Sequence, residues 1–166
     1  YIYSDGNNFN SLLAIDNFSN MDFINNTLRS NIITSNSRAT RFNTYDFESF
    51  NFKNNILFSY NNNRCLDYQG TYGSVSSSHN NFYNQGGSLV QWNGVFYSSI
   101  SSLATATINH ANSHQLPPLF IDGNNYTPQQ PLFNNNGTLT PSVTIDIEGN
   151  TRNNPPDIGC KEFTPP

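Results

Sequence analysis

The stretch Phe23-Ile24-Asn25-Asn26-Thr27-Leu28 decides the fold, because the chain repeats it as Phe52-Lys53-Asn54-Asn55-Ile56-Leu57. A looser copy follows at His79-Asn80-Asn81-Phe82-Tyr83. A repeat of roughly 20–30 residues is typical of one turn of a β-solenoid, in which strands of successive turns pair in parallel about 4.8 Å apart. The sequence therefore predicts an all-β fold of stacked parallel turns.

The abundance of asparagine fits the same fold. The 166 residues include 30 Asn and 19 Ser, while charged residues make up only 11% of the chain. Asn tolerates left-handed backbone and hydrogen-bonds its own backbone, so it suits the bends between strands. Asn side chains at the same bend of successive turns can stack into a ladder of amides. We expect this structural role for Asn26, Asn55 and Asn81.

Charge and hydropathy exclude two classes of partner. Seven Lys and Arg residues and a net charge of −4 give no surface for neutralising phosphates, so we expect no nucleic acid. No apolar run approaches the roughly 20 residues that cross a bilayer, so no transmembrane segment is predicted.

The chain changes character near residue 98. Ser98 can cap a short helix that places Ile100, Leu103 and Ala104 on one face. From Asn109 onward the sequence is rich in Pro and Asn, which is typical of an irregular covering segment. We therefore divide the chain into strand-bearing turns over residues 1–97 and a short helix, covering segment and closing motif over residues 98–166.

The second half of the chain carries an ordered series of motifs. They are Asn80-Asn81-Phe82-Tyr83, Trp92-Asn93-Gly94, Ala111-Asn112-Ser113, Pro118-Leu119-Phe120, Asp146-Ile147-Glu148-Gly149-Asn150-Thr151-Arg152 and Asp157-Ile158-Gly159-Cys160-Lys161-Glu162. The series resembles the C-terminal region of right-handed parallel β-helix proteins secreted by Bacteroidetes, the "choice-of-anchor" group. That region closes with Asp-x-x-Gly-x-x-Arg and then Asp-Ile-Gly-x-x-Glu. The chain departs from the pattern at four positions. Cys160 stands where Ala is usual, and Asp is usual at the other three, which are Glu148, His110 and Pro117.

The resemblance implies a right-handed parallel β-helix that is secreted or lies on the extracellular face of the outer membrane. It implies no single reaction, because a fold hosts many functions. We expect a non-enzymatic module that binds a polysaccharide or a protein partner at the cell surface. Such a module can be a subunit of an outer-membrane complex. The alternative is the C-terminal part of a polysaccharide lyase or glycoside hydrolase. We expect the N-terminal end to be continued by more turns or covered by a partner chain.

The closing motif concentrates charge, in Asp146, Glu148, Arg152, Asp157 and Glu162. Asp146, Glu148 and Asp157 offer the oxygen ligands that Ca²⁺ takes, so Ca²⁺ is the one cofactor that the sequence suggests. The favoured interpretation is structural, with Arg152 pairing with Asp146, Asp157 or Glu162 to hold the tail against the last turn. Gly149 and Gly159 then serve as tight-turn positions.

Catalytic candidates are weak. A lyase needs a cation beside the substrate carboxylate, and Arg38, Arg41 and Lys53 are available. A hydrolase needs two carboxylates, and Asp46 with Glu48 is the close acidic pair of the repeat region. We expect surface roles for all five residues, unless they converge in one groove.

Aromatic residues are the candidates for ligand binding. Tyr and Trp rings make good platforms for sugars, and Tyr60, Tyr68, Tyr72 and Trp92 lie near the repeat bends. The alternative role for these rings is packing beneath the bends. Cys65 and Cys160 can form one disulfide or remain two buried thiols, and the sequence leaves both states open.

Overall fold

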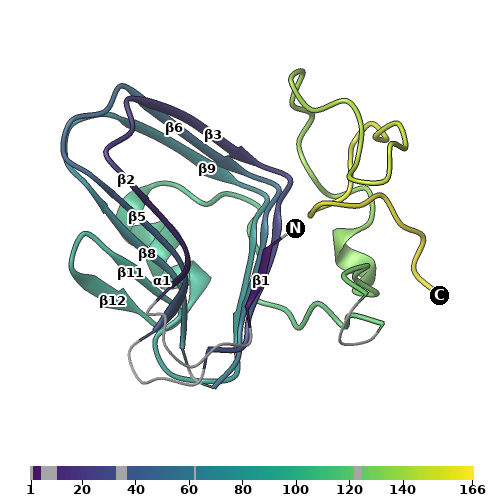
Figure 1. The fold of residues 1–166 in the computed structure, drawn as a ribbon, viewed down its shortest axis with the longest axis horizontal. Coiled ribbons are helices and arrows are strands. Elements are labelled where there is room, and N and C mark those ends of the chain that lie inside the picture. The colour runs from purple at the N-terminus through teal and green to yellow at the C-terminus, as the bar shows by residue number, and fades with distance from the viewer. Residues whose placement is uncertain (1, 5–10, 33–36, 62, 122–124) are drawn as a thin grey trace.

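The chain folds mainly into short β-strands that recur in sets of three (Figure 1). The computed structural model describes residues 2–4, 11–32, 37–61, 63–121 and 125–166. The strands are β1 (Ile2–Ser4), β2 (Ser11–Asp16), β3 (Asn20–Ile24), β4 (Thr27–Ser30), β5 (Arg38–Thr44), β6 (Ser49–Lys53), β7 (Ile56–Ser59), β8 (Arg64–Gly70), β9 (Ser74–Ser78), β10 (Asn81–Asn84), β11 (Val90–Trp92) and β12 (Val95–Tyr97). The helices are α1 (Ile100–Thr107) and the 3-10 turn η1 (Pro131–Phe133).

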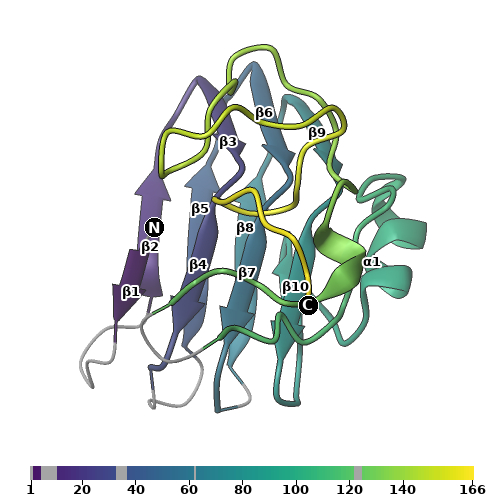
Figure 2. The same ribbon diagram turned by 90° about the vertical axis from the view of Figure 1, so that its right-hand side faces the viewer.

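Strands β1 to β8 each pair in parallel with the strand three places later. The resulting sheets are β1-β4-β7-β10, β3-β6-β9 and β12-β11-β8-β5-β2, and β12 alone among these strands is antiparallel to its neighbour. Figure 1 shows the sheets on three sides of the interior, and Figure 2 shows β1, β4, β7 and β10 side by side. The all-β class and the parallel pairing are thus confirmed.

The interior is filled by aromatic rings stacked between successive strands. Phe23 and Phe52 stack with ring centroids 5.5 Å apart, and Phe82 continues the column at 6.0 Å from Phe52. The parallel register explains the first pair, since Phe23 lies opposite Phe52 on neighbouring strands, whereas Phe82 reaches the column from β10 of another sheet. Stacked rings bury large apolar surfaces and prefer such offset geometry.

An asparagine ladder runs across the bends between two of the sheets. The Asn26 backbone N–H donates to Oδ1 of Asn55 at 2.9 Å, and the Asn55 N–H donates to Oδ1 of Asn80 at 2.9 Å. The third member is Asn80 and not the expected Asn81. The reason is that His79 fills the left-handed position before it, as Asn25 and Asn54 do in the earlier bends.

Asn81 has a different structural role. It starts β10, and its amide exchanges two hydrogen bonds with the backbone of Leu116, at 3.0 and 2.9 Å. The segment around Ala111 extends the ladder one step further, because Oγ of Ser113 accepts from the Asn80 N–H at 3.1 Å. The covering segment therefore supplies a fourth bend, with Asn112 in left-handed conformation.

Helix α1 confirms the predicted helix with its cap shifted by one residue. Ser99, not Ser98, is the N-cap, and its side chain accepts from the Ser102 N–H at 3.2 Å. Leu103 is the buried anchor of the helix. The helix lies beyond β10, on the side opposite to β1 (Figure 2). No helix within the described ranges is long and apolar enough to cross a membrane.

Ile108 caps the C-terminal end of α1 in left-handed conformation, with φ 53° and 93% of its surface exposed. A β-branched residue costs about 1–2 kcal/mol there, while Gly adopts this conformation freely. We therefore expect Ile108→Gly to raise the free energy of unfolding by about 1 kcal/mol in urea denaturation. Ile108→Val, which keeps the branch, is the control. Equal stability of the two variants contradicts the prediction.

The C-terminal tail covers the outer face of the β4-β7-β10 sheet (Figure 1). Ile56, Phe133 and Ile158 form a second buried cluster there. The Gly159 N–H donates to the Asn54 carbonyl at 2.8 Å, and the Cys160 N–H donates to Oγ1 of Thr27 at 3.1 Å. The sequence predicts that the tail packs against the last turn, but the tail packs against earlier strands. The reason is that the side chain of Ile56 is buried there against Phe133 and Ile158 of the C-terminal region.

Candidate functional site

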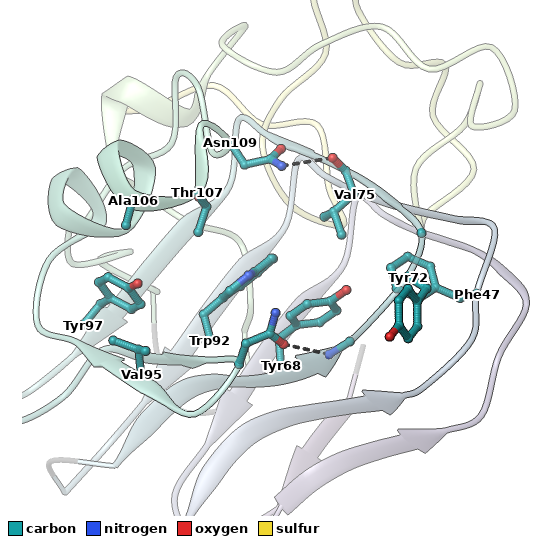
Figure 3. Close-up of a pocket in the computed structure, with 13 residues that line it drawn as sticks. Phe47, Tyr68, Tyr72, Val75, Trp92, Val95, Tyr97, Ala106, Thr107 and Asn109 are labelled. Atoms are coloured by element: carbon teal, nitrogen blue, oxygen red, sulfur yellow. Dashed lines mark hydrogen bonds between the residues drawn. The ribbon is translucent and has the colours of Figure 1, made fainter.

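The end of the molecule beside α1 carries an aromatic pocket of about 430 Å³ (Figure 3). We call it the aromatic pocket. Its five rings come from the corner after β5, from β8 and its following corner, and from β11 and β12: Phe47, Tyr68, Tyr72, Trp92 and Tyr97. Three of the four aromatic residues that the sequence singles out, Tyr68, Tyr72 and Trp92, thus meet in one place.

Parallel register brings Tyr68 and Trp92 together. The two residues lie opposite each other on β8 and β11, and their ring centroids are 4.1 Å apart. Phe50 stacks on the other face of Tyr68 at 5.8 Å. Trp92 ends this stack because β11 is the last parallel strand of its sheet, so its ring borders the pocket and the edge of His110.

Hydrogen-bonding groups of the aromatic pocket are available to a ligand. The hydroxyls of Tyr68, Tyr72 and Tyr97 make no hydrogen bond to another residue in the described part of the chain, nor does Nδ2 of Asn93. Tyr68 is only 1% exposed, and burial raises its pKa to about 12, so the hydroxyls of Tyr72 and Tyr97 are the more accessible ones. By contrast, both ends of the Asn109 side-chain amide have partners. Its Oδ1 accepts from the Ser77 N–H at 2.8 Å, and its Nδ2 donates to the Val75 carbonyl at 3.0 Å.

No charged side chain belongs to the described lining of the aromatic pocket. A charged ligand would lose its hydration there without gaining a counter-charge, which is costly. The arrangement therefore suits a neutral ligand with a flat apolar face and several hydroxyl groups.

Gly70 and Gly73 give the aromatic pocket its shape. A Cβ on Gly70 would lie 2.1 Å from the Tyr68 hydroxyl oxygen, and one on Gly73 would lie 2.3 Å from the Phe47 carbonyl oxygen. Both contacts are far inside normal separations, so only Gly fits. The sequence shows these glycines, but the packing that requires them is visible only in three dimensions.

Tyr60 lies elsewhere. Its hydroxyl accepts from Nη2 of Arg29 at 2.6 Å, and the Arg29 guanidinium lies 5.2 Å from the centre of its ring. A smaller hollow there is bordered by Phe58, Tyr83 and Phe120 as well. Tyr60 therefore packs around Arg29 and does not join the other aromatic candidates.

The five catalytic candidates do not share a groove. Arg38 and Arg41 both lie on β5. Arg38 pairs with Asp67 at 3.6 Å, and Arg41 pairs with Asp16 at 2.7 Å. Burial lowers the pKa of Arg38. The other three candidates lie on the next corner and on β6, in a different sheet: Asp46, Glu48 and Lys53. Nothing in this placement sets an acid and a base around one substrate position.

Carboxylates of the closing motif accept hydrogen bonds from the backbone. Oδ1 of Asp146 accepts from the N–H groups of Glu148 and Asn150, both at 2.8 Å, and Oδ2 accepts from the Glu162 N–H at 3.1 Å. Burial raises the pKa of Asp146, but these bonds and one from the Asn150 side chain outweigh it and hold the pKa below its ordinary value. Asp157 accepts from the N–H groups of Asn135 and Phe163.

Arg152 pairs with Glu162 at 2.8 Å and donates to the Gly159 carbonyl at 3.1 Å. The sequence leaves three acids open as the partner of Arg152, and Glu162 is the one that pairs with it. Asp146, Glu148 and Asp157 are not gathered as a cation site, since the described residues include no cluster of three metal-ligating side chains. The geometry agrees with the structural interpretation of the motif.

Cys65 and Cys160 are both free and both buried. The pairing alternative is therefore not realised. Cys65 lies in β8, whereas Cys160 lies in the tail, where its N–H donates to Oγ1 of Thr27 in β4, a strand of another sheet. Burial raises the pKa of the Cys65 thiol, so it stays protonated and unreactive at neutral pH.

No protein-family model, no curated protein and no solved structure matches this chain. Its function must therefore be argued from the sites themselves.

His110 packs edge-on against Trp92 of the aromatic pocket, with ring centroids 5.0 Å apart. The titration of His110 predicts that the folded protein loses stability in acid. Burial lowers the pKa of His110 to about 4, and its Nδ1 lies 2.8 Å from Oγ of Ser77. Because the unfolded chain binds this proton near pH 6.5, stability is complete above that pH and falls as the pH drops towards 4. We expect this group to account for a loss of up to about 3 kcal/mol in urea denaturation.

Comparison with a variant isolates that contribution. Burial also lowers the pKa of His79 and of His114, so the wild-type pH profile includes their contributions in the same direction. We expect His110→Gln to flatten the profile between pH 6.5 and 4 more than His79→Gln does. An unchanged slope in His110→Gln would mean that His110 has the same pKa in the folded and the unfolded protein, which contradicts the prediction.

Proposed function

We propose that this chain is a non-enzymatic glycan-binding module and that its aromatic pocket binds a neutral saccharide. The observation that carries this proposal is the stack of Tyr68 and Trp92, which ends in an uncharged pocket bordered by tyrosine hydroxyls. Sugar rings have C–H faces that pack on aromatic rings and an equatorial fringe of hydroxyls that need partners. The pocket offers both kinds of contact at once.

The proposal includes the fold and the address of the protein. We propose that the three parallel sheets are the turns of a right-handed parallel β-helix, and that the protein is secreted or displayed on the extracellular face of the outer membrane. The ordered motifs that close the chain support both points through their resemblance to the Bacteroidetes group. The regular pairing of each strand from β1 to β8 with the third strand after it is consistent with such a coil.

The edge formed by β2 and β3 supports a further part of the proposal. Ile15 and Met21 are only partly buried, whereas their partners in the register, Phe42 and Phe50, are fully buried. We propose that another strand-bearing segment covers this edge, either a preceding turn of a longer chain or a partner at the cell surface. Covered edges also avoid unwanted strand pairing.

The alternative function, as part of a polysaccharide lyase or glycoside hydrolase, gains no supporting observation. Such an enzyme needs its acid, base and cation around one bond. Arg38 and Arg41 of β5 are engaged with Asp67 of β8 and Asp16 of β2, and Lys53 lies in another sheet.

Affinity electrophoresis through polysaccharide gels tests the proposal. We expect retardation by at least one neutral polymer among xylan, glucomannan, β-glucan and dextran, and less by polygalacturonate. Tyr72 is 83% exposed, so Tyr72→Ala removes a ring without disturbing the fold, and we expect about a 3- to 10-fold weaker affinity, the value of one aromatic stacking contact. Phe96→Ala, an exposed ring on β12 outside the pocket lining, is the matched control. Equal mobility in every gel would contradict the proposal.

A further inference from the structure

A second hollow of about 340 Å³ adjoins the aromatic pocket. We call it the corner pocket, and Thr44, Tyr45, Gln69 and Thr71 border it. Gly70 and Asn93 border both pockets, so the two hollows meet along one rim.

One hydrogen bond fixes the rim between the pockets. The Gly70 N–H donates to Oδ1 of Asn93 at 2.8 Å, which ties the end of β8 to the turn between β11 and β12. Asn93 therefore supplies the side chain of the shared rim, and an extended ligand that occupies both pockets passes over it.

One exposed tyrosine stands at each pocket. Tyr72 borders the aromatic pocket, and Tyr45, which is 67% exposed, borders the corner pocket. Hydrogen bonds join the corners that carry them, because Oγ1 of Thr71 donates to the Tyr45 carbonyl at 2.9 Å and the Phe47 N–H donates to the Tyr72 carbonyl at 3.2 Å. These bonds hold the backbone of the two tyrosines at a set separation, so that both rings project from neighbouring corners.

The described lining of the corner pocket, like that of the aromatic pocket, contains no charged side chain. From the shared rim, the paired tyrosines and the uncharged lining, we propose that the two pockets are adjacent subsites for one neutral oligosaccharide of two or more sugar units. Tyr45 is then the residue that contributes affinity for the second sugar. This inference rests on the proposed function of the aromatic pocket.

Calorimetric titration with cello-, xylo- and manno-oligosaccharides of one to six units tests the inference. We expect affinity for the best series to rise about 10-fold or more from one unit to four and then to level off. Tyr45→Ala removes most of this gain and leaves the affinity for the monosaccharide unchanged. Tyr72→Ala weakens binding at every length, and Phe96→Ala changes neither.

The outcomes separate the two claims. An affinity that does not change with chain length, or a gain that survives in Tyr45→Ala, overturns the two-subsite inference and leaves the aromatic pocket as a single-sugar site. Absence of binding by all three series and by the neutral polymers overturns the proposed function itself.

Discussion

Asn55→Ala is expected to lower the free energy of unfolding by about 3–5 kcal/mol. Asn55 is fully buried at the centre of the ladder. Its Nδ2 donates to the Phe23 carbonyl at 2.8 Å and to Oδ1 of Asn80 at 3.0 Å, and its Oδ1 accepts from the Asn26 N–H at 2.9 Å. Truncation leaves the Phe23 carbonyl and the Asn26 N–H without these partners, each at a cost of about 1–3 kcal/mol, while Oδ1 of Asn80 keeps its bond from the Asn55 backbone N–H. Chemical denaturation measures the loss.

Two further variants separate hydrogen bonding from packing. Asn55→Asp keeps the volume but turns the donor into an acceptor that faces two oxygens, so we expect a loss at least as large as in Asn55→Ala. Asn51→Ala removes an exposed amide that donates to Asp22 at 2.7 Å, and we expect a change within about 0.5 kcal/mol. An Asn55→Asp variant as stable as the wild type would show that the ladder contributes nothing.

Arg152→Met is expected to destabilise the tail by about 3–5 kcal/mol, because it leaves the Glu162 carboxylate buried without its cation. The Arg152 side chain is 3% exposed and that of Glu162 is 9% exposed. The tail can detach before the strands unfold, so hydrogen exchange of the Gly159 and Cys160 amides is the measurement. Both amides bond to earlier strands, and we expect their protection to fall sharply in the variant.

A surface ion pair of the same motif supplies the control. Lys161 pairs with Glu148, whose side chain is 53% exposed. We expect Glu148→Gln to change stability by no more than about 1 kcal/mol. We also expect Arg152→Met combined with Glu162→Gln to cost less than the sum of the two single changes, since the second removes the stranded charge. Undiminished amide protection in Arg152→Met contradicts this account of the tail.

The repeated bends can be predicted from the sequence, whereas contacts between segments that do not repeat cannot. The recurrence of Asn25-Asn26 as Asn54-Asn55 predicts the bends, because a left-handed residue followed by a ladder amide is a local requirement. The one-residue error at Asn81 arises because His79 occupies the left-handed position, which the Asn-Asn pattern does not reveal.

The position of the tail was missed although the sequence holds a signal for it. β7 reads Ile56-Leu57-Phe58, and all three residues are buried. Strands with one wet face alternate apolar and polar residues, so a continuous apolar run indicates burial on both faces. That run predicts a cover over β7, but the sequence does not say which segment supplies it.

The aromatic pocket was predicted only in part. Tyr68 and Trp92 are 24 residues apart, close to one repeat, and the register therefore places them together. Tyr60 also lies near a bend, yet it packs around Arg29 instead. The pocket itself is the space left between α1, β11 and two corners, so it depends on the placement of the helix and not on any single motif.

Trp92 is the only tryptophan of the chain and borders the aromatic pocket, so its fluorescence tests the central claim directly. Titration with neutral oligosaccharides of four to six units should produce a saturable change in Trp92 emission, weaker in Tyr72→Ala and unchanged in Phe96→Ala. Calorimetric binding of a saccharide with no change in Trp92 emission would place the ligand elsewhere. No binding up to ~10 mM saccharide, a level that detects even the weakest specific sites, would contradict the glycan-binding account.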